Sequence, residues 1–207
     1  MHLKQENGYL PDLAELKALV TPETKMICLN NPNNPTGALM SEAQLQQIVD
    51  IARSVDAYIL CDEVYRHLTQ TDDWCPSIAD LYEKGISVSS MSKVFSLAGL
   101  RLGWIATRDA AALKAFLSHR DYNLISCGLF DDAAASVALA HRDVMLRRNQ
   151  TIVRENLAIL DAWVDEHEHF YYTKPKAGTT ALVYYDYDIP SYEFCKEMYH
   201  NCLLYTS

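Results

Sequence analysis

The chain has 207 residues, of which 49% are hydrophobic and 22% are charged, so its length and composition suit a globular protein with one full domain and part of another. The net charge of −9 and the absence of a basic run argue against nucleic acid as a partner, because phosphate contacts need clustered Lys and Arg side chains. No apolar run approaches membrane-spanning length and residues 1–7 contain no signal-peptide core, so we expect a cytoplasmic location and no membrane partner.

In the first half of the chain, strand-like apolar runs alternate with helical patterns. A helix is predicted at 11–20, and a second helix starts at Ser41, where Gln44 completes a capping box. Short strands are predicted at 25–29, 57–60, 86–89 and 102–107. This alternation indicates the α/β fold class, with a doubly wound, mostly parallel sheet.

The second half of the chain is predicted to be helical and then to start a smaller domain. Helices are expected at 110–119, 130–141 and 143–167, and the polar stretch 119–123 is interpreted as a solvated connection that could also approach a substrate or a neighbouring subunit. Aromatic and small residues then alternate over 170–186, as in the first strands of a smaller α+β domain. We therefore divide the chain into a large domain at 1–160 and the start of a small domain at 161–207.

Cysteine and histidine are scattered rather than clustered. The six cysteines form no CxxC pair and the seven histidines show no metal-ligand spacing, so neither a disulfide nor a metal site is expected. Cys28 and Cys61 lie in apolar strand-like runs and are expected to be buried thiols.

Three of the predicted strands lead directly into polar motifs. NNPNNPTG occupies 30–37, CDEVY occupies 61–65, and SMSK occupies 90–93, with Arg101 eight residues after Lys93. Ligands bind at the carboxyl ends of strands in open α/β sheets. A lysine can form a Schiff base with a carbonyl and an arginine can clamp a phosphate, and pyridoxal 5′-phosphate (PLP) is an aldehyde with a phosphate arm that needs both.

With these three motifs in this order, the chain resembles the class I and II aminotransferases, which are PLP-dependent enzymes of fold type I, from about residue 8 to about residue 186. The resemblance implies that Lys93 carries the Schiff base and then acts as the general base. It implies that Asp62 pairs with the ring nitrogen of PLP, and that Tyr65 and Asn34 donate hydrogen bonds to its 3′-oxygen. Apart from the resemblance, Asp62 also suits a helix cap, and Asn34 suits a turn that positions its amide.

The same resemblance assigns the phosphate of PLP to the third motif. Arg101 matches the phosphate-binding arginine, whose planar fork suits two phosphate oxygens. Ser90 matches the hydroxyl that binds phosphate, and Ser92 is a further candidate that is also explained as a turn residue.

The resemblance implies an aminotransferase that moves an amino group between an amino acid and a 2-oxo acid and works as a homodimer. Two alternatives remain open. The same scaffold hosts PLP-dependent lyases and specialised amino-acid-modifying enzymes, including capreomycidine-synthase-like and arginine-oxidising branches. The chain is alternatively a catalytically inactive fragment. The motifs do not identify the amino acid or the oxo acid, because the cofactor carries the chemistry that these enzymes share.

Two parts of the family pattern are missing from the sequence. We expect a truncated product that lacks an N-terminal phosphate-binding turn and a C-terminal arginine for the substrate carboxylate, and whose residues after Tyr199 depart from the family. Such a chain exposes apolar surface and open strand edges, so poor solubility is expected.

Overall fold

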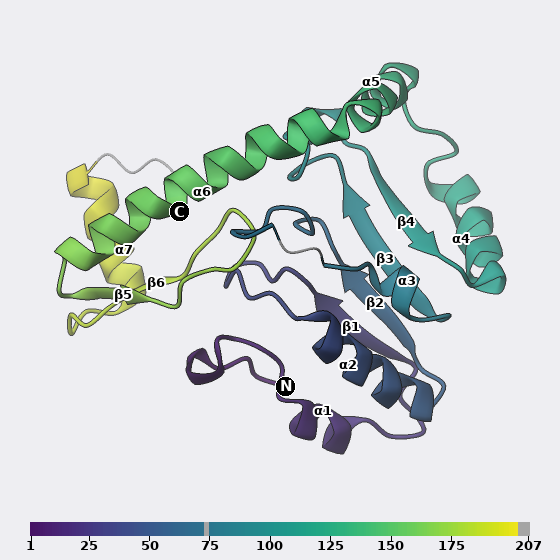
Figure 1. Cartoon of the computed structure of the whole chain (residues 1–207), viewed down its shortest axis with the longest axis horizontal. Helices are drawn as coiled ribbons and strands as arrows, with labels where there is room; N and C mark the ends of the chain where they lie inside the picture. The colour runs from purple at the N-terminus through teal and green to yellow at the C-terminus, as the bar shows by residue number, and fades with distance from the viewer. Residues whose placement is uncertain (73–74, 203–207) are drawn as a thin grey trace.

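A four-stranded sheet forms the centre of the computed structural model, which describes residues 1–72 and 75–202 (Figure 1). Its strands β1 (Met26–Asn30), β2 (Tyr58–Asp62), β3 (Gly85–Ser90) and β4 (Gly103–Thr107) lie in the order β1-β2-β3-β4. The first three are parallel and β4 is antiparallel to β3, which confirms the mostly parallel α/β sheet. Residues 203–207, part of the stretch predicted to depart from the family, lie outside the described residues.

One face of the sheet is covered by α2 (Glu42–Ser54) and the short α3 (Ile78–Leu81). The predicted capping box starts α2, since Ser41 accepts from the backbone of Gln44 and the Gln44 side chain accepts from the backbone of Ser41. The buried side chains of this face come from both helices and from two strands: Leu45, Ile48, Val49, Ala52, Ile78, Ile27, Ile59 and Cys61. Because side chains alternate along a strand, the burial of these residues means that their neighbours in the same strands point toward the opposite face of the sheet.

The opposite face is more exposed at its two edge strands. Cys28 on β1 is exposed and Ile105 on β4 is 50% exposed. The expectation that Cys28 is buried was therefore wrong, whereas Cys61 is buried. Side chains alternate along a strand, so an apolar run does not tell which of its residues face the covered side.

Three helices follow the sheet along the chain. These are α4 (Ala110–Asn123), α5 (Leu129–Ala140) and the long α6 (Arg142–Glu166), which spans from the sheet to a second, smaller layer (Figure 1). Residues 119–123 form the last turn of α4 and not a connection between helices, because the helical hydrogen bonds continue to its end at Leu124. α4 and α5 leave much apolar surface open, including Leu129 and Phe130.

The smaller layer is an antiparallel hairpin of β5 (Phe170–Tyr172) and β6 (Val183–Tyr185), followed by α7 (Ser191–Cys202). Near the amino terminus, the 3₁₀ turn η1 (Gln5–Asn7) precedes α1 (Leu13–Leu19), which lies beside β1 (Figure 1). A second 3₁₀ turn, η2 (Ala98–Leu100), precedes β4.

None of the helices in the described ranges is long and apolar enough to cross a bilayer. The predicted domain boundary at 160 falls inside α6 and stays a prediction.

Candidate active site

The loops after β1, β2 and β3 meet at one edge of the sheet, because the register places Asn30, Asp62 and Val88 side by side. Asn30 joins two of these loops. Its Nδ2 donates to the backbone oxygen of Asp62 at 3.4 Å, and its Oδ1 accepts from the backbone N–H of Asn34. Asn30 was not among the predicted site residues, although it opens the first motif, and its two contacts fix Asn34 relative to Asp62.

The second motif places a carboxylate and a phenol at the end of β2. Asp62 is the last residue of the strand, and its Oδ1 accepts from the backbone N–H of Val64 at 3.0 Å. Tyr65 is only 2% exposed. The Nζ of Lys93 lies 5.9 Å from the centre of the Tyr65 ring, so the amine of the third motif lies near the aromatic ring of the second.

The third motif turns sharply after β3. Ser90 is the last residue of that strand, and its Oγ accepts from the backbone N–H of Ser92 at 3.3 Å, which agrees with a turn role for Ser92. Lys93 is exposed. Arg101 follows η2 with a φ of +49°, and its guanidinium donates to the backbone oxygen of Ala98 at 2.8 Å. Arg101 therefore faces its own loop in this structure, while its exposure leaves the side chain free to turn.

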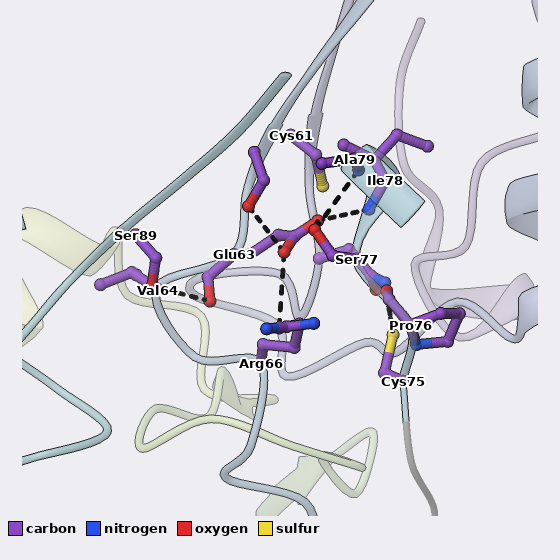
Figure 2. Close-up of polar contacts among 12 residues, drawn as sticks. Cys61, Glu63, Val64, Arg66, Cys75, Pro76, Ser77, Ile78, Ala79 and Ser89 are labelled. Atoms are coloured by element: carbon purple, nitrogen blue, oxygen red, sulfur yellow. Dashed lines mark hydrogen bonds and ion pairs between the residues drawn. The ribbon is translucent and has the colours of Figure 1, made fainter. Parts of the chain in front are cut away.

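The residue after Asp62 is a buried glutamate, Glu63, with several polar contacts (Figure 2). Glu63 is 3% exposed, and its Oε1 accepts from Ser77 Oγ at 3.1 Å and from the backbone N–H of Ile78 at 2.7 Å. Its Oε2 accepts from Ser87 Oγ at 2.8 Å and forms an ion pair with Arg66 Nε at 3.4 Å. Both oxygens of this buried charge are therefore satisfied, as a carboxylate in the interior requires.

Glu63 also fastens β2 to β3 through its backbone. Its N–H donates to Val88 O at 2.8 Å, and Ser89 Oγ donates to its carbonyl at 3.5 Å. Since successive residues of a strand face opposite sides, Glu63 anchors the strand end from the covered side while Asp62 faces the other. The sequence contains the signal for this pair, two adjacent acidic residues at a strand end, but the predicted site used only Asp62.

His67 lies two residues after Tyr65, and its pKa is strongly lowered. Burial, followed by the charges of Arg66 and Arg142, lowers the pKa of His67 to about 4. The ring lines a cavity of about 170 Å³ that Trp104 also lines. His67 is therefore neutral at pH 7 and packs as an uncharged ring.

The residues at this edge suit one cofactor better than a metal. The described residues contain no group of three His, Cys, Asp or Glu side chains that could hold a metal ion. The amine of Lys93, the carboxylate of Asp62, the phenol of Tyr65 and the amide of Asn34 match the aldehyde, the ring nitrogen and the ring oxygen of PLP. A hydroxyl and a guanidinium, from Ser90 and Arg101, are available for its phosphate.

Comparison with known proteins identifies relatives with this fold. The family model for aminotransferase class I and II matches residues 1–203. The chain is similar to capreomycidine synthase of Streptomyces vinaceus (27% identity, 87% of this chain, 46% of the relative) and to an aspartate aminotransferase of Pyrococcus abyssi (35% identity, 65% of this chain, 35% of the relative). A crystal structure of a PLP-dependent aminotransferase from Streptococcus suis is similar with a TM-score of 0.92 and 45% identity, over 96% of this chain and 52% of that one. The chain thus spans about half the length of its relatives, or less.

Proposed function

The chain belongs to the class I and II aminotransferase family, and we propose that it is the cofactor-binding part of a PLP-dependent aminotransferase. Such an enzyme moves an amino group between an amino acid and a 2-oxo acid. The observation that carries the proposal is the meeting of Asn34, Asp62, Tyr65 and Lys93 at the carboxyl ends of three neighbouring strands.

When bound, PLP supplies an electron-poor ring that takes up the electron pair left at the α-carbon of the amino acid. Asp62 holds a proton on the ring nitrogen, because a carboxylate beside that nitrogen favours its charged form. Tyr65 and Asn34 donate hydrogen bonds to the ring oxygen from two different loops. The tie between Asn30 and both loops keeps these groups at a fixed spacing.

Lys93 would hold the cofactor covalently through Nζ. When free, its Nζ would act as the general base that moves a proton between the α-carbon of the substrate and the carbon that bears the aldehyde of the cofactor. The exposure of Lys93 leaves room for that movement. Ser90 and Arg101 bind the phosphate, and Ser92 is a further candidate for the same role.

The resemblance also supports a homodimer, which we include in the proposal together with the cytoplasmic location expected from the sequence. Gel filtration at several concentrations of the PLP-loaded protein tests the first point. A protein that stays monomeric at all concentrations contradicts it.

A second function is kept because it fits one of the relatives. The similarity to capreomycidine synthase extends over 87% of this chain, and the similarity to an aspartate aminotransferase of Sulfolobus acidocaldarius extends over 86%, so the extent of the match favours neither function. A PLP-dependent lyase or a specialised amino-acid-modifying enzyme would use the same residues on another substrate. The remaining alternative is an inactive fragment.

Product analysis with a panel of amino acids separates these functions. A transaminase gives a 2-oxo acid together with pyridoxamine phosphate, and it turns over only when a second 2-oxo acid is present. A lyase releases ammonia without any oxo-acid acceptor. A chain that forms no product in either assay, with Lys93→Ala giving the same result, contradicts an enzymatic function for this chain.

A further inference from the structure

The loop between β5 and β6 crosses the loops that hold the predicted site residues (Figure 1). We name residues 175–180 of this loop the strap. On one side, Lys176 N–H and Ala177 N–H donate to the backbone oxygen of Gly37 at 2.9 and 3.1 Å. The strap is thereby fastened to the turn that carries Asn34.

On its other side, the strap is fastened to the segment that follows Tyr65. Gly178 N–H donates to Leu68 O at 2.7 Å, and Gln70 N–H donates to Lys176 O at 2.9 Å. Ala177 pairs with Thr69 in an isolated antiparallel bridge, and both are buried. One segment of the smaller layer therefore joins two loops of the sheet.

Glycine occupies both contacts of the strap, at Gly37 because of close approach and at Gly178 because of its backbone conformation. A Cβ at Gly37 would lie 2.2 Å from Pro175 Cβ, which no side chain tolerates. Gly178 has a φ of +85°, and a Cβ there would lie 3.9 Å from the Tyr65 ring. The strap thus passes close to the ring of Tyr65.

The strap also reaches the Asn34 side chain through a hydroxyl. Thr180 Oγ1 donates to Asn34 Oδ1 at 3.5 Å. A side-chain amide has an acceptor end and a donor end that exchange when it flips. With its oxygen held by Thr180, Asn34 directs Nδ2 the other way, as a donor.

We propose that the strap is a positioning element for the two ring-oxygen donors, with its backbone holding Tyr65 in place and Thr180 fixing the orientation of the Asn34 amide. This inference rests on the proposed function, because it assigns the strap a role toward bound PLP. Thr180 is a positioning residue and touches no reacting atom.

The test compares Thr180→Val, which removes the hydroxyl, with Thr180→Ser, which keeps it. Thr179→Val is the matched control, since Thr179 is exposed on the same strap and lines a cavity beside α6. The first readout is the pH midpoint of the visible absorbance of bound PLP. A hydrogen bond to the ring oxygen of PLP makes the Lys93 nitrogen that is joined to PLP lose its proton more readily. Weakening the hydrogen bond from Asn34 in Thr180→Val therefore raises the pH midpoint by about half a unit. PLP affinity falls about fivefold in Thr180→Val.

The second readout needs no cofactor. In ¹⁵N-labelled protein, the Asn34 side-chain NH₂ signals shift or broaden in Thr180→Val and match the wild type in Thr180→Ser and Thr179→Val. Equal midpoints and equal NH₂ signals in Thr180→Val and wild type overturn the inference. If wild-type protein binds no PLP, the proposed function fails for this chain, and the amide signals alone decide whether Thr180 orients Asn34.

Discussion

Replacing the buried Glu63 by Gln removes the negative charge of this side chain but keeps its size and shape. The carboxylate accepts four contacts in a site that is 3% exposed. In Glu63→Gln the amide oxygen can keep the contacts of Ser77 and Ile78. Its NH₂ then faces Ser87, whose hydroxyl can turn to accept, and Arg66, which has only donors. In the variant, Arg66 therefore faces a hydrogen-bond donor where the wild type has a carboxylate oxygen.

The size of the effect follows from these contacts. A hydrogen bond to a charged group contributes about 1.5–3 kcal/mol, and breaking a buried ion pair costs about 3–5 kcal/mol. Because Arg66 is partly exposed and can turn toward water, we expect Glu63→Gln to lower the free energy of unfolding by about 2 kcal/mol. For a chain of this length, that corresponds to a drop in Tm of about 4–8 °C.

Urea unfolding followed by circular dichroism measures this difference, with Glu83→Gln as the control. Glu83 also pairs with an arginine, Arg53, but on the surface, so its replacement should change the urea midpoint little. The reasoning is refuted if Glu63→Gln unfolds at the same urea concentration as wild type, or if the two variants are equally destabilised.

Three further predictions concern other parts of the fold. Gly37→Ala places a Cβ against Pro175 at a residue with a positive φ, so it should lower the free energy of unfolding by about 2–4 kcal/mol. Urea unfolding measures this change, and an unchanged urea midpoint would show that the strap is not held tightly against Gly37. Because the pKa of His67 is lowered to about 4 from 6.5, the unfolded chain binds more protons between these values, so stability is complete above pH 6.5 and falls toward pH 4. His67→Asn should reduce the loss of stability between pH 6.5 and pH 4, which is measured as the difference between the urea midpoints at pH 7.5 and pH 5. If the variant and the wild type show the same difference, His67 is not a buried neutral ring. Leu129 and Phe130 are 79% and 88% exposed, so the chain should self-associate in gel filtration and Phe130→Asp should reduce this; a monodisperse wild-type monomer contradicts the prediction.

The positions of the strands and of their motifs could be predicted because both signals are local. An apolar run followed by a polar turn defines a strand end, and the runs before 30–37, 61–65 and 90–93 all form parallel strands ending at one edge. The capping box at Ser41 was likewise predictable, since both of its partners lie within one turn.

Other features depend on partners far away in the chain, which periodicity does not reveal. The exposure of Cys28 depends on which face the helices cover. The carboxylate of Glu63 binds Ser77 and Ser87, residues 14 and 24 positions away. The contact between Thr180 and Asn34 joins residues 146 positions apart. The four-residue α3 was not predicted, because so short a helix shows no period of its own.

The account depends most directly on Lys93 as the residue that binds PLP. Purified chain should be incubated with PLP, reduced with borohydride, digested, and analysed by mass spectrometry. We predict one reduced PLP adduct, located on the peptide that contains Lys93 and absent from Lys93→Ala. An adduct spread over surface lysines, or one that persists in Lys93→Ala, would contradict the assignment of this site.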